Sequence, residues 1–170
     1  SYLGNFMLNK TDVITGYVTT MPYYLKSSNL PFIVFRPSNY GIDFYGDCIF
    51  TSERELQEYP ERTANFLAAS LRGWEYALAN TEEIIDLILS QYKGDKNYLT
   101  REALRYEAKT MRELILPDLV EIGHMNPGRW KHMADTFVEL GMASEDYSLD
   151  GFFYNPEKSL LEKFERMIKY

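Results

Sequence analysis

The chain has 170 residues, of which 45% are hydrophobic and 25% charged; these values are ordinary for one folded domain and exclude a disordered or collagen-like chain. Its formal charge is −7, from 18 Lys and Arg against 25 Asp and Glu, and such an acidic surface repels phosphate backbones. Nucleic acid is therefore not an expected partner. No apolar run approaches the ~20 residues that a membrane-spanning helix needs.

Residues before position 52 favour strands and turns, because they are rich in Tyr, Phe, Val, Ile and Thr and are interrupted by Pro and Gly. We predict short strands over residues 12–20, 31–35 and 48–51, each bounded by turn-forming residues. Pro22 can open a helical turn after the first strand, and residues 37–46 have the composition of a loop. Three short strands rarely form a stable sheet alone, so we expect strands from another stretch of polypeptide to complete the sheet.

After residue 52 the pattern is helical, with N-cap residues, acidic first turns and apolar residues at a spacing of about 3.6. The predicted helices cover residues 53–58, 60–78, 81–94, 100–115, 127–140 and 159–170. In the second of them we expect one buried stripe of large side chains, namely Phe66, Leu67, Leu71, Trp74 and Leu78. In the fourth, the expected stripe is Leu104, Ala108 and Met111, with Leu114 or Ile115. The pattern as a whole is helix-rich, with a few short strands before the helices.

Cysteine and histidine are scarce. Cys48 is the only cysteine, which excludes an intrachain disulfide and a cysteine-based metal site. His124 and His132 could join Glu121 and Asp135 around a metal, but nothing in the sequence fixes a third ligand. We therefore expect no metal and no cofactor, with His124 in a turn and His132 in solvent.

Motifs of catalysis are absent from the sequence: it contains no G-x-S-x-G, H-E-x-x-H, Walker A or G-x-G-x-x-G pattern. The acid pair Glu82 and Glu83 lies in a first helical turn, where the helix dipole explains it. A basic helix face, which we expect to be solvated, is formed by Arg101, Arg105, Lys109 and Arg112. We expect a protein that is not an enzyme.

Two glycine-punctuated segments carry the candidate site: residues 16–20 (GYVTT) and 40–47 (YGIDFYGD). Aromatic and hydroxyl side chains at strand ends suit a site that stacks a planar ring and hydrogen-bonds its edge. The alternative is ordinary turn chemistry with buried tyrosines. The residues alone leave both interpretations open.

Several stretches resemble the type II periplasmic binding proteins of the thiamine-pyrimidine-precursor (SsuA/THI5-like) family. They are residues 13–25, 40–50 (YGIDFYGDCIF), 59–62 (YPER) and 71–77 (LRGWEYA). Residues 123–142 (GHMNPGRWKHMADTFVELGM) and 149–154 (LDGFFY) are similar to a subgroup of the family. In that subgroup the module is the extracytoplasmic sensor domain of a membrane signalling protein, such as a histidine kinase or a diguanylate cyclase.

The resemblance implies a two-lobed α/β protein that closes on a small ligand at a hinge and binds it without catalysis. The implied ligand is heteroaromatic and pyrimidine-like. The positions that the resemblance assigns to ligand binding are Tyr17, Thr19, Thr20, Tyr40, Asp43 and Tyr45. Thr20 and Met21 stand where the family has Asn and Glu, which implies a changed specificity.

The resemblance also implies a division of the chain. Residues 1–40 would be the remainder of the second lobe with the crossover strand, and residues 41–170 the helical C-terminal part of the first lobe. The N-terminal half of the fold would be missing; it would be complemented by another piece of chain or by a homodimer that pairs exposed strand edges.

Three functions stay open for such a chain, with a periplasmic or other extracytoplasmic location expected for the first two. The first is the sensor domain, and the second is the substrate-binding component of an ABC transporter, with a membrane permease as partner. The third is a helical interaction domain without a pocket. A pyrimidine-synthesis enzyme of the same fold would need a cysteine-rich iron site, which a chain with one cysteine cannot form.

Overall fold

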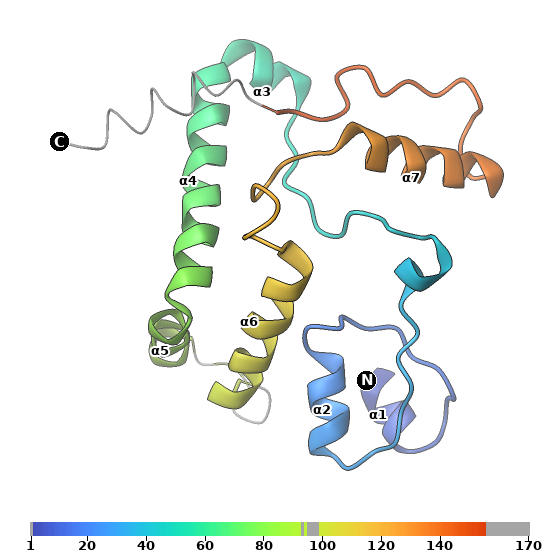
Figure 1. Ribbon diagram of the computed structural model, residues 1–170, viewed down its shortest axis with the longest axis vertical. Coiled ribbons are helices and arrows are strands. Elements are labelled where there is room, and N and C mark those ends of the chain that lie inside the picture. Colours follow the sequence, from blue (N-terminus) through green and yellow to red (C-terminus); the bar gives the residue numbers. More distant parts are fainter. Residues whose placement is uncertain (1, 93, 95–98, 156–170) are drawn as a thin grey trace. The chain divides into compact units, whose positions relative to one another are not determined.

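The computed structural model describes residues 2–92, 94 and 99–155, and in this part of the chain every regular element is a helix (Figure 1). It divides into two compact units. The first consists of Ser1–Val34 and Glu75–Val120, and the second of Phe35–Trp74 and Glu121–Tyr170. The helix predicted over residues 159–170 lies outside the described residues.

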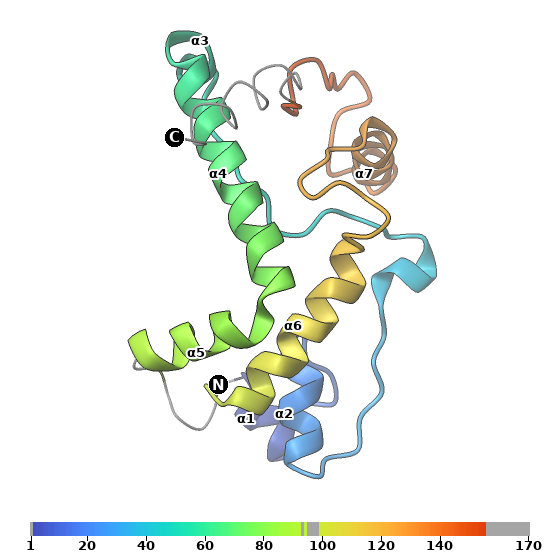
Figure 2. The ribbon, with the colours of Figure 1, turned by 60° about the vertical axis from the view of Figure 1, so that its left-hand side comes forward.

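The first unit is built around α6, which lies between α5 and α2 (Figure 2). Its helices are α1 (Tyr2–Met7), α2 (Met21–Ser27), α5 (Thr81–Gln91) and α6 (Arg101–Ile115). Thr100 caps α6, because its hydroxyl accepts a hydrogen bond from the Ala103 amide at 3.1 Å. Leu25, Ile85 and Ala103, one from each of the three packed helices, are buried and form the small core of this unit.

Arginine–carboxylate pairs join α5 to α6. Arg105 donates to both carboxylate oxygens of Glu82, at 2.6 and 2.8 Å, and Arg101 donates to Glu82 at 3.0 Å and also pairs with Asp86. The hydrogen bond from Arg105 lowers the pKa of Glu82 below its usual value. The prediction of a basic face that meets only solvent is therefore wrong for Arg101 and Arg105. Arg112 likewise pairs with Asp118 at 2.8 Å.

The second unit contains η1 (Pro37–Tyr40), α3 (Glu53–Glu58), the first part of α4 (Pro60–Ala79) and α7 (Pro127–Glu139). Ser52 caps α3 by accepting from the Glu55 amide at 3.2 Å. Asn126 caps α7 by accepting from the amides of Gly128 and Arg129, at 2.8 and 3.3 Å. These caps lie where the sequence predicted helix starts, and the helices predicted over residues 53–58, 60–78, 81–94, 100–115 and 127–140 are confirmed within one to three residues at their ends.

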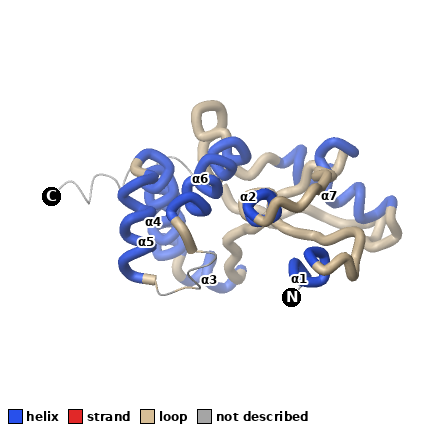
Figure 3. Tube along the Cα trace, turned by 90° about the horizontal axis from the view of Figure 1, so that it is seen from below, coloured by secondary structure: helices blue, strands red, loops and turns tan. Residues whose placement is uncertain are grey.

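The three predicted strands do not form. Residues 12–20, 31–35 and 48–51 are irregular or form turns, and no strand occurs in the described residues (Figure 3). Their large side chains are open to solvent, with exposed fractions of 80% for Ile33, 72% for Phe35 and 93% for Phe50. A strand exists only when a neighbour satisfies its backbone groups, and apolar composition alone does not provide that neighbour. The α/β fold class is therefore not confirmed.

The expected buried stripes are also corrected. In α4, Phe66 is 63% and Trp74 44% exposed, whereas the small residues Ala64 and Ala68 are buried. In α6 the buried positions are Ala103 and Thr110 rather than the predicted stripe one position away. Periodicity identifies an apolar face, but burial depends on which neighbour covers it.

The sequence-based division into residues 1–40 and 41–170 assigns pieces to the lobes of a larger fold and stays a prediction. The two units found here interleave along the chain instead of following one another. Among the described residues, no helix combines the length and apolar character needed to cross a membrane.

Candidate ligand-binding site

The first predicted segment forms a tight turn that leads into α2. The amides of Thr20 and Met21 both donate to the Tyr17 carbonyl, at 3.2 and 2.9 Å. Gly16 is suited to this turn, because a Cβ atom at its position would lie 3.0 Å from the terminal carbon of the Met21 side chain. Tyr17, Thr19 and Thr20 are thus neighbours in one turn, as their spacing requires.

Helix α6 holds this turn from one side. The Tyr106 hydroxyl donates to the Val18 carbonyl at 3.3 Å, and the Tyr106 ring packs against Tyr23 of α2 with 5.6 Å between the ring centres. Thr19 and Thr20 are half-buried, whereas Tyr17 is 69% exposed. The backbone of the turn is therefore fixed while the Tyr17 ring remains open to solvent, where a planar ligand could stack on it.

The second predicted segment starts at the end of η1. Gly41 has φ of +81°, a left-handed conformation that ends the short helix and that side-chain-bearing residues rarely adopt. Its amide donates to the Ser38 carbonyl at 3.3 Å, and the Ile42 amide donates to Pro37 at 3.1 Å. Tyr40, the last residue of η1, is 69% exposed. From Gly41 the chain runs along α7.

Arg129 of α7 contacts two of the predicted ligand-binding residues at once. Its Nη2 donates to Asp43 Oδ2 at 2.5 Å, and the central carbon of its guanidinium lies 4.9 Å from the centre of the Tyr45 ring. The hydrogen bond that Arg129 donates to Asp43 raises the pKa of Arg129, so the guanidinium stays charged. Asp43, Arg129 and Tyr45 therefore form an ion pair joined to a cation–π contact.

Further polar contacts fix the same segment. The Asn126 amide donates to the Tyr45 hydroxyl at 2.7 Å, and the Tyr45 amide lies 3.4 Å from the Met133 sulfur. His132 Nε2 lies 2.6 Å from the Gly41 carbonyl, so it carries the proton of that bond. The prediction that His132 is merely solvated is corrected by this contact.

Aromatic rings complete the contact between α7 and residues 41–45. Trp130 packs against Tyr45, with ring centres 4.9 Å apart, and against Phe152 at 5.0 Å. Phe44 packs against Phe137 at 5.6 Å. The Trp130 indole N–H is buried and has no hydrogen-bond partner among the described residues, so ring packing accounts for its position there.

The structure thus groups the six predicted residues into two sets. Tyr17, Thr19 and Thr20 share a turn in the first unit. Asp43 and Tyr45 both contact Arg129 in the second unit, which also contains Tyr40 at the end of η1. Because the sets belong to different units, their meeting in one site stays a prediction.

Sequence reasoning missed Arg129, Trp130 and Asn126 as neighbours of this segment. Trp130, Met133 and Phe137 lie at helical spacing within the predicted helix 127–140, but nothing local indicates which segment they meet. Among residues 2–92, 94 and 99–155, no group of three or more His, Cys, Asp or Glu side chains could hold a metal ion.

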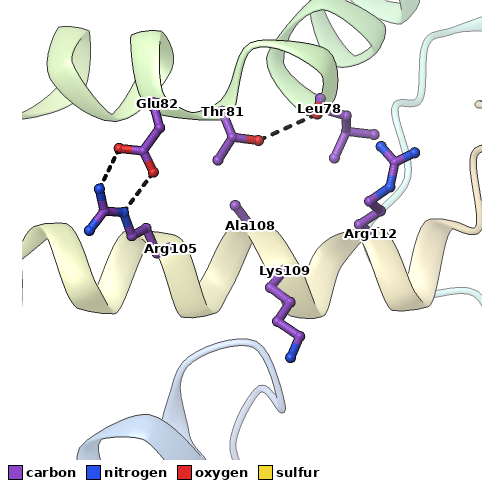
Figure 4. Close-up of a pocket in the computed structure, with 7 residues that line it drawn as sticks. All are labelled: Leu78, Thr81, Glu82, Arg105, Ala108, Lys109 and Arg112. Carbon is purple, nitrogen blue, oxygen red and sulfur yellow. Dashed lines mark hydrogen bonds and ion pairs between the residues drawn. The ribbon is translucent and has the colours of Figure 1, made fainter.

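A separate hollow of about 320 Å³ lies beside α5 and α6 (Figure 4). It is lined by Leu78, Thr81, Glu82, Arg105, Ala108, Lys109 and Arg112. Figure 4 shows Glu82 facing Arg105, and the Thr81 hydroxyl donates to the Leu78 carbonyl at 3.4 Å. Lys109 points away from α5. Glu82 and Arg105 satisfy each other, and none of the predicted ligand-binding residues lines this hollow.

Comparison with known proteins bears on the first half of the chain. Residues 2–84 match the model of a family described as NMT1/THI5 like. This part of the chain, just under half of it, is similar to the NMT1/THI5-like family. The match includes both predicted ligand-binding segments and confirms the resemblance seen in residues 13–77. No curated protein and no solved structure matches the chain.

The similarity to the NMT1/THI5-like family supports an extracytoplasmic solute-binding function, a small-molecule ligand and the type II periplasmic-binding fold. The matched range ends before residues 123–142 and 149–154, which carry the likeness to the sensor subgroup. The subgroup is therefore not confirmed.

Proposed function

We propose that this chain is part of an extracytoplasmic module that binds a small heteroaromatic, pyrimidine-like ligand by closure of two lobes and does not catalyse a reaction. The observation that carries the proposal is the NMT1/THI5-like match, whose range contains all six predicted ligand-binding residues. Absence of the known catalytic motifs from the sequence supports binding without chemistry.

The side chains in the two segments have the chemistry for such a ligand. Tyr17 and Tyr40 are each 69% exposed and offer ring faces for stacking. Thr19 and Thr20 offer hydroxyl groups that donate or accept, and the Asp43 carboxylate accepts from ring or amino N–H groups. Stacking supplies affinity, and hydrogen bonds to the ring edge supply selectivity.

For the role of the module, we propose the sensor domain of a histidine kinase or a diguanylate cyclase. The likeness of residues 123–142 and 149–154 to that subgroup supports this role. The alternative is the binding component of an ABC transporter, which would dock on a membrane permease. The full-length gene distinguishes them: a transmembrane helix and a signalling domain downstream support the sensor, and a lipoprotein signal without such a domain supports the transporter.

The sheet of the proposed fold needs a completing partner, either the N-terminal half of the fold or a second copy. The exposed Ile33, Phe35 and Phe50 lie in the segments that would become strands. If a second copy completes the sheet, the purified chain should sediment as a dimer, and sedimentation velocity measures this.

Thermal melting against a ligand panel tests the proposed binding function. The panel contains pyrimidines with and without amino groups, amino acids and polyamines. We expect a pyrimidine to raise the melting temperature, and we expect Asp43→Asn to reduce this rise. Asp150→Asn is the matched control, since Asp150 is an exposed carboxylate outside both segments. Absence of any shift would contradict the proposal and favour a helical interaction domain.

A further inference from the structure

A guanidinium group already occupies the Asp43–Tyr45 pair. Arg129 Nη2 donates to Asp43 Oδ2 at 2.5 Å while the guanidinium lies over the Tyr45 ring, 4.9 Å from its centre. We infer that Asp43 and Tyr45 select a ligand group that is planar, cationic and rich in N–H donors, such as a guanidinium or amidinium, and that Arg129 competes with it. This inference rests on the proposed function and narrows its ligand class.

The geometry uses two properties of the guanidinium together. Its edge presents N–H donors to the carboxylate, and its flat face lies against the aromatic ring. A compact ammonium ion can pair with Asp43, but it has no planar face to stack on Tyr45. The pair therefore discriminates between cations by shape as well as by charge.

Tyr45 is held in place independently of Arg129. The Asn126 amide donates to its hydroxyl at 2.7 Å, the Trp130 ring packs against it at 4.9 Å, and its own amide contacts the Met133 sulfur at 3.4 Å. The ring would thus stay in position when the guanidinium leaves. Asp43 lies two residues earlier on the same segment, so the receptor half of the contact is preorganised.

Arg129 itself is held weakly. Its side chain is 39% exposed and that of Asp43 57%, and solvent-exposed ion pairs contribute little. Arg129 also lies in the first turn of α7, where the positive end of the helix dipole disfavours a cation. The place of Arg129 therefore depends on Asp43 and Tyr45, and a ligand that offers the same group can exchange with it.

Tethering makes Arg129 an effective competitor despite its weak contacts. An intramolecular group acts at an effective concentration in the millimolar range, so a free probe with the same chemistry binds only when Arg129 is away. Removing Arg129 makes the pair available at all times. From the strength of exposed ion pairs and cation–π contacts, we expect apparent affinity for a guanidinium probe to rise about fivefold.

The experiment titrates methylguanidinium against the full chain, with methylammonium as the compact control, at constant ionic strength. Trp130 fluorescence reports binding in a Trp74→Phe background, since the sequence has two tryptophans. We expect Arg129→Gln to bind methylguanidinium about fivefold tighter than the parent while methylammonium changes by less than about twofold. We expect Asp43→Asn to remove the gain, and Arg129→Lys, which keeps the charge without the planar group, to give a smaller gain.

Two results would overturn the inference. One is an Arg129→Gln variant that binds methylguanidinium no tighter than the parent, and the other is an equal gain for methylammonium, which would indicate charge alone. Circular dichroism checks that each variant is folded, and Arg129→Lys provides the comparison if Arg129→Gln is not. If a pyrimidine raises the melting temperature of the parent and of Arg129→Gln by the same amount, the inference is refuted and the proposed function stands. If Arg129→Gln binds methylguanidinium more tightly but no ligand of the panel raises the melting temperature, the proposed function is refuted and the inference about Asp43 and Tyr45 stands.

Discussion

Two contacts in this chain use arginine in different ways. Between α5 and α6, Arg105 places two donors on the two oxygens of one carboxylate, Glu82. Between α7 and residues 41–45, Arg129 divides its guanidinium between one oxygen of Asp43 and the face of Tyr45, beside a cluster of aromatic rings. The first arrangement joins two helices. In the second, as inferred above, Asp43 and Tyr45 can bind another planar cation in place of Arg129.

The same difference predicts how each contact fails. The α7 contact depends on ring packing and should be sensitive to truncation of its aromatic side chains. The α5–α6 contact depends on exposed ion pairs and should respond to pH and salt.

The largest effect should come from Trp130→Ala. The Trp130 ring packs against both Tyr45 and Phe152, and losing a half-buried tryptophan should lower the free energy of unfolding by about 2–3 kcal/mol. Urea unfolding followed by circular dichroism measures the loss. Trp74→Ala is the control, because Trp74 is 44% exposed and should cost under about 1 kcal/mol. Equal losses for the two variants would show that the ring cluster does not hold α7.

The caps of α6 and α7 offer a matched comparison of the two contacts. Asn126→Ala and Thr100→Ala each remove a side-chain acceptor at a helix start and should each cost about 1 kcal/mol. Amide hydrogen exchange should localise the loss of protection to α7 and residues 41–45 for Asn126→Ala, and to α6 for Thr100→Ala. Asn126→Asp, which keeps an acceptor, should restore most of the protection, and a failure to do so would point away from capping.

The pH dependence of amide protection should further distinguish the α5–α6 contact from the contact of α7 with residues 41–45. The pKa of Glu82 is lowered in the folded chain, chiefly by its hydrogen bond from Arg105, so its contribution is complete above the unfolded value and is lost as pH falls through the folded value. Protection of α5 and α6 amides should therefore decline between about pH 5 and pH 3. Glu82→Gln should flatten this decline; an unchanged profile would mean that other carboxylates control it.

The smallest effect should be on stability in Arg129→Gln. Because the Arg129–Asp43 pair is exposed, its removal should change the free energy of unfolding by less than about 1 kcal/mol, which is the size of the fivefold gain expected for methylguanidinium. Urea unfolding measures the free energy of unfolding of Arg129→Gln, and the loss is compared with that of Trp130→Ala. A loss as large as that of Trp130→Ala would make Arg129 a structural residue and not a replaceable occupant of the site.

Local signals explain what could be predicted from the sequence. Thr100 and Asn126 cap helices that begin where the sequence predicted helix starts, because a cap depends on residues within one turn. The turn of Tyr17, Thr19 and Thr20 is local in the same sense, but the prediction of a strand over residues 12–20 was wrong there. The NMT1/THI5-like resemblance was visible because its motifs are short runs of sequence.

Nonlocal partners explain what could not be predicted. Residues 31–35 and 48–51 have strand composition, yet strands form only against a neighbour. Phe66 lies on an apolar stripe but is exposed, because the stripe does not specify its cover. The contact of Arg129 with Asp43 joins residues 86 positions apart, which no pattern in one sequence indicates.

A titration of the isotopically labelled chain with 4-aminopyrimidine, followed by amide chemical shifts, tests the central claim that these two segments bind a ligand. The account predicts saturable shifts at Tyr17, Thr19, Asp43 and Tyr45, which are lost in Asp43→Asn and kept in Asp150→Asn. A saturating titration that leaves these amides unmoved, or that shifts only those around Arg105 and Arg112 beside the other hollow, would contradict it.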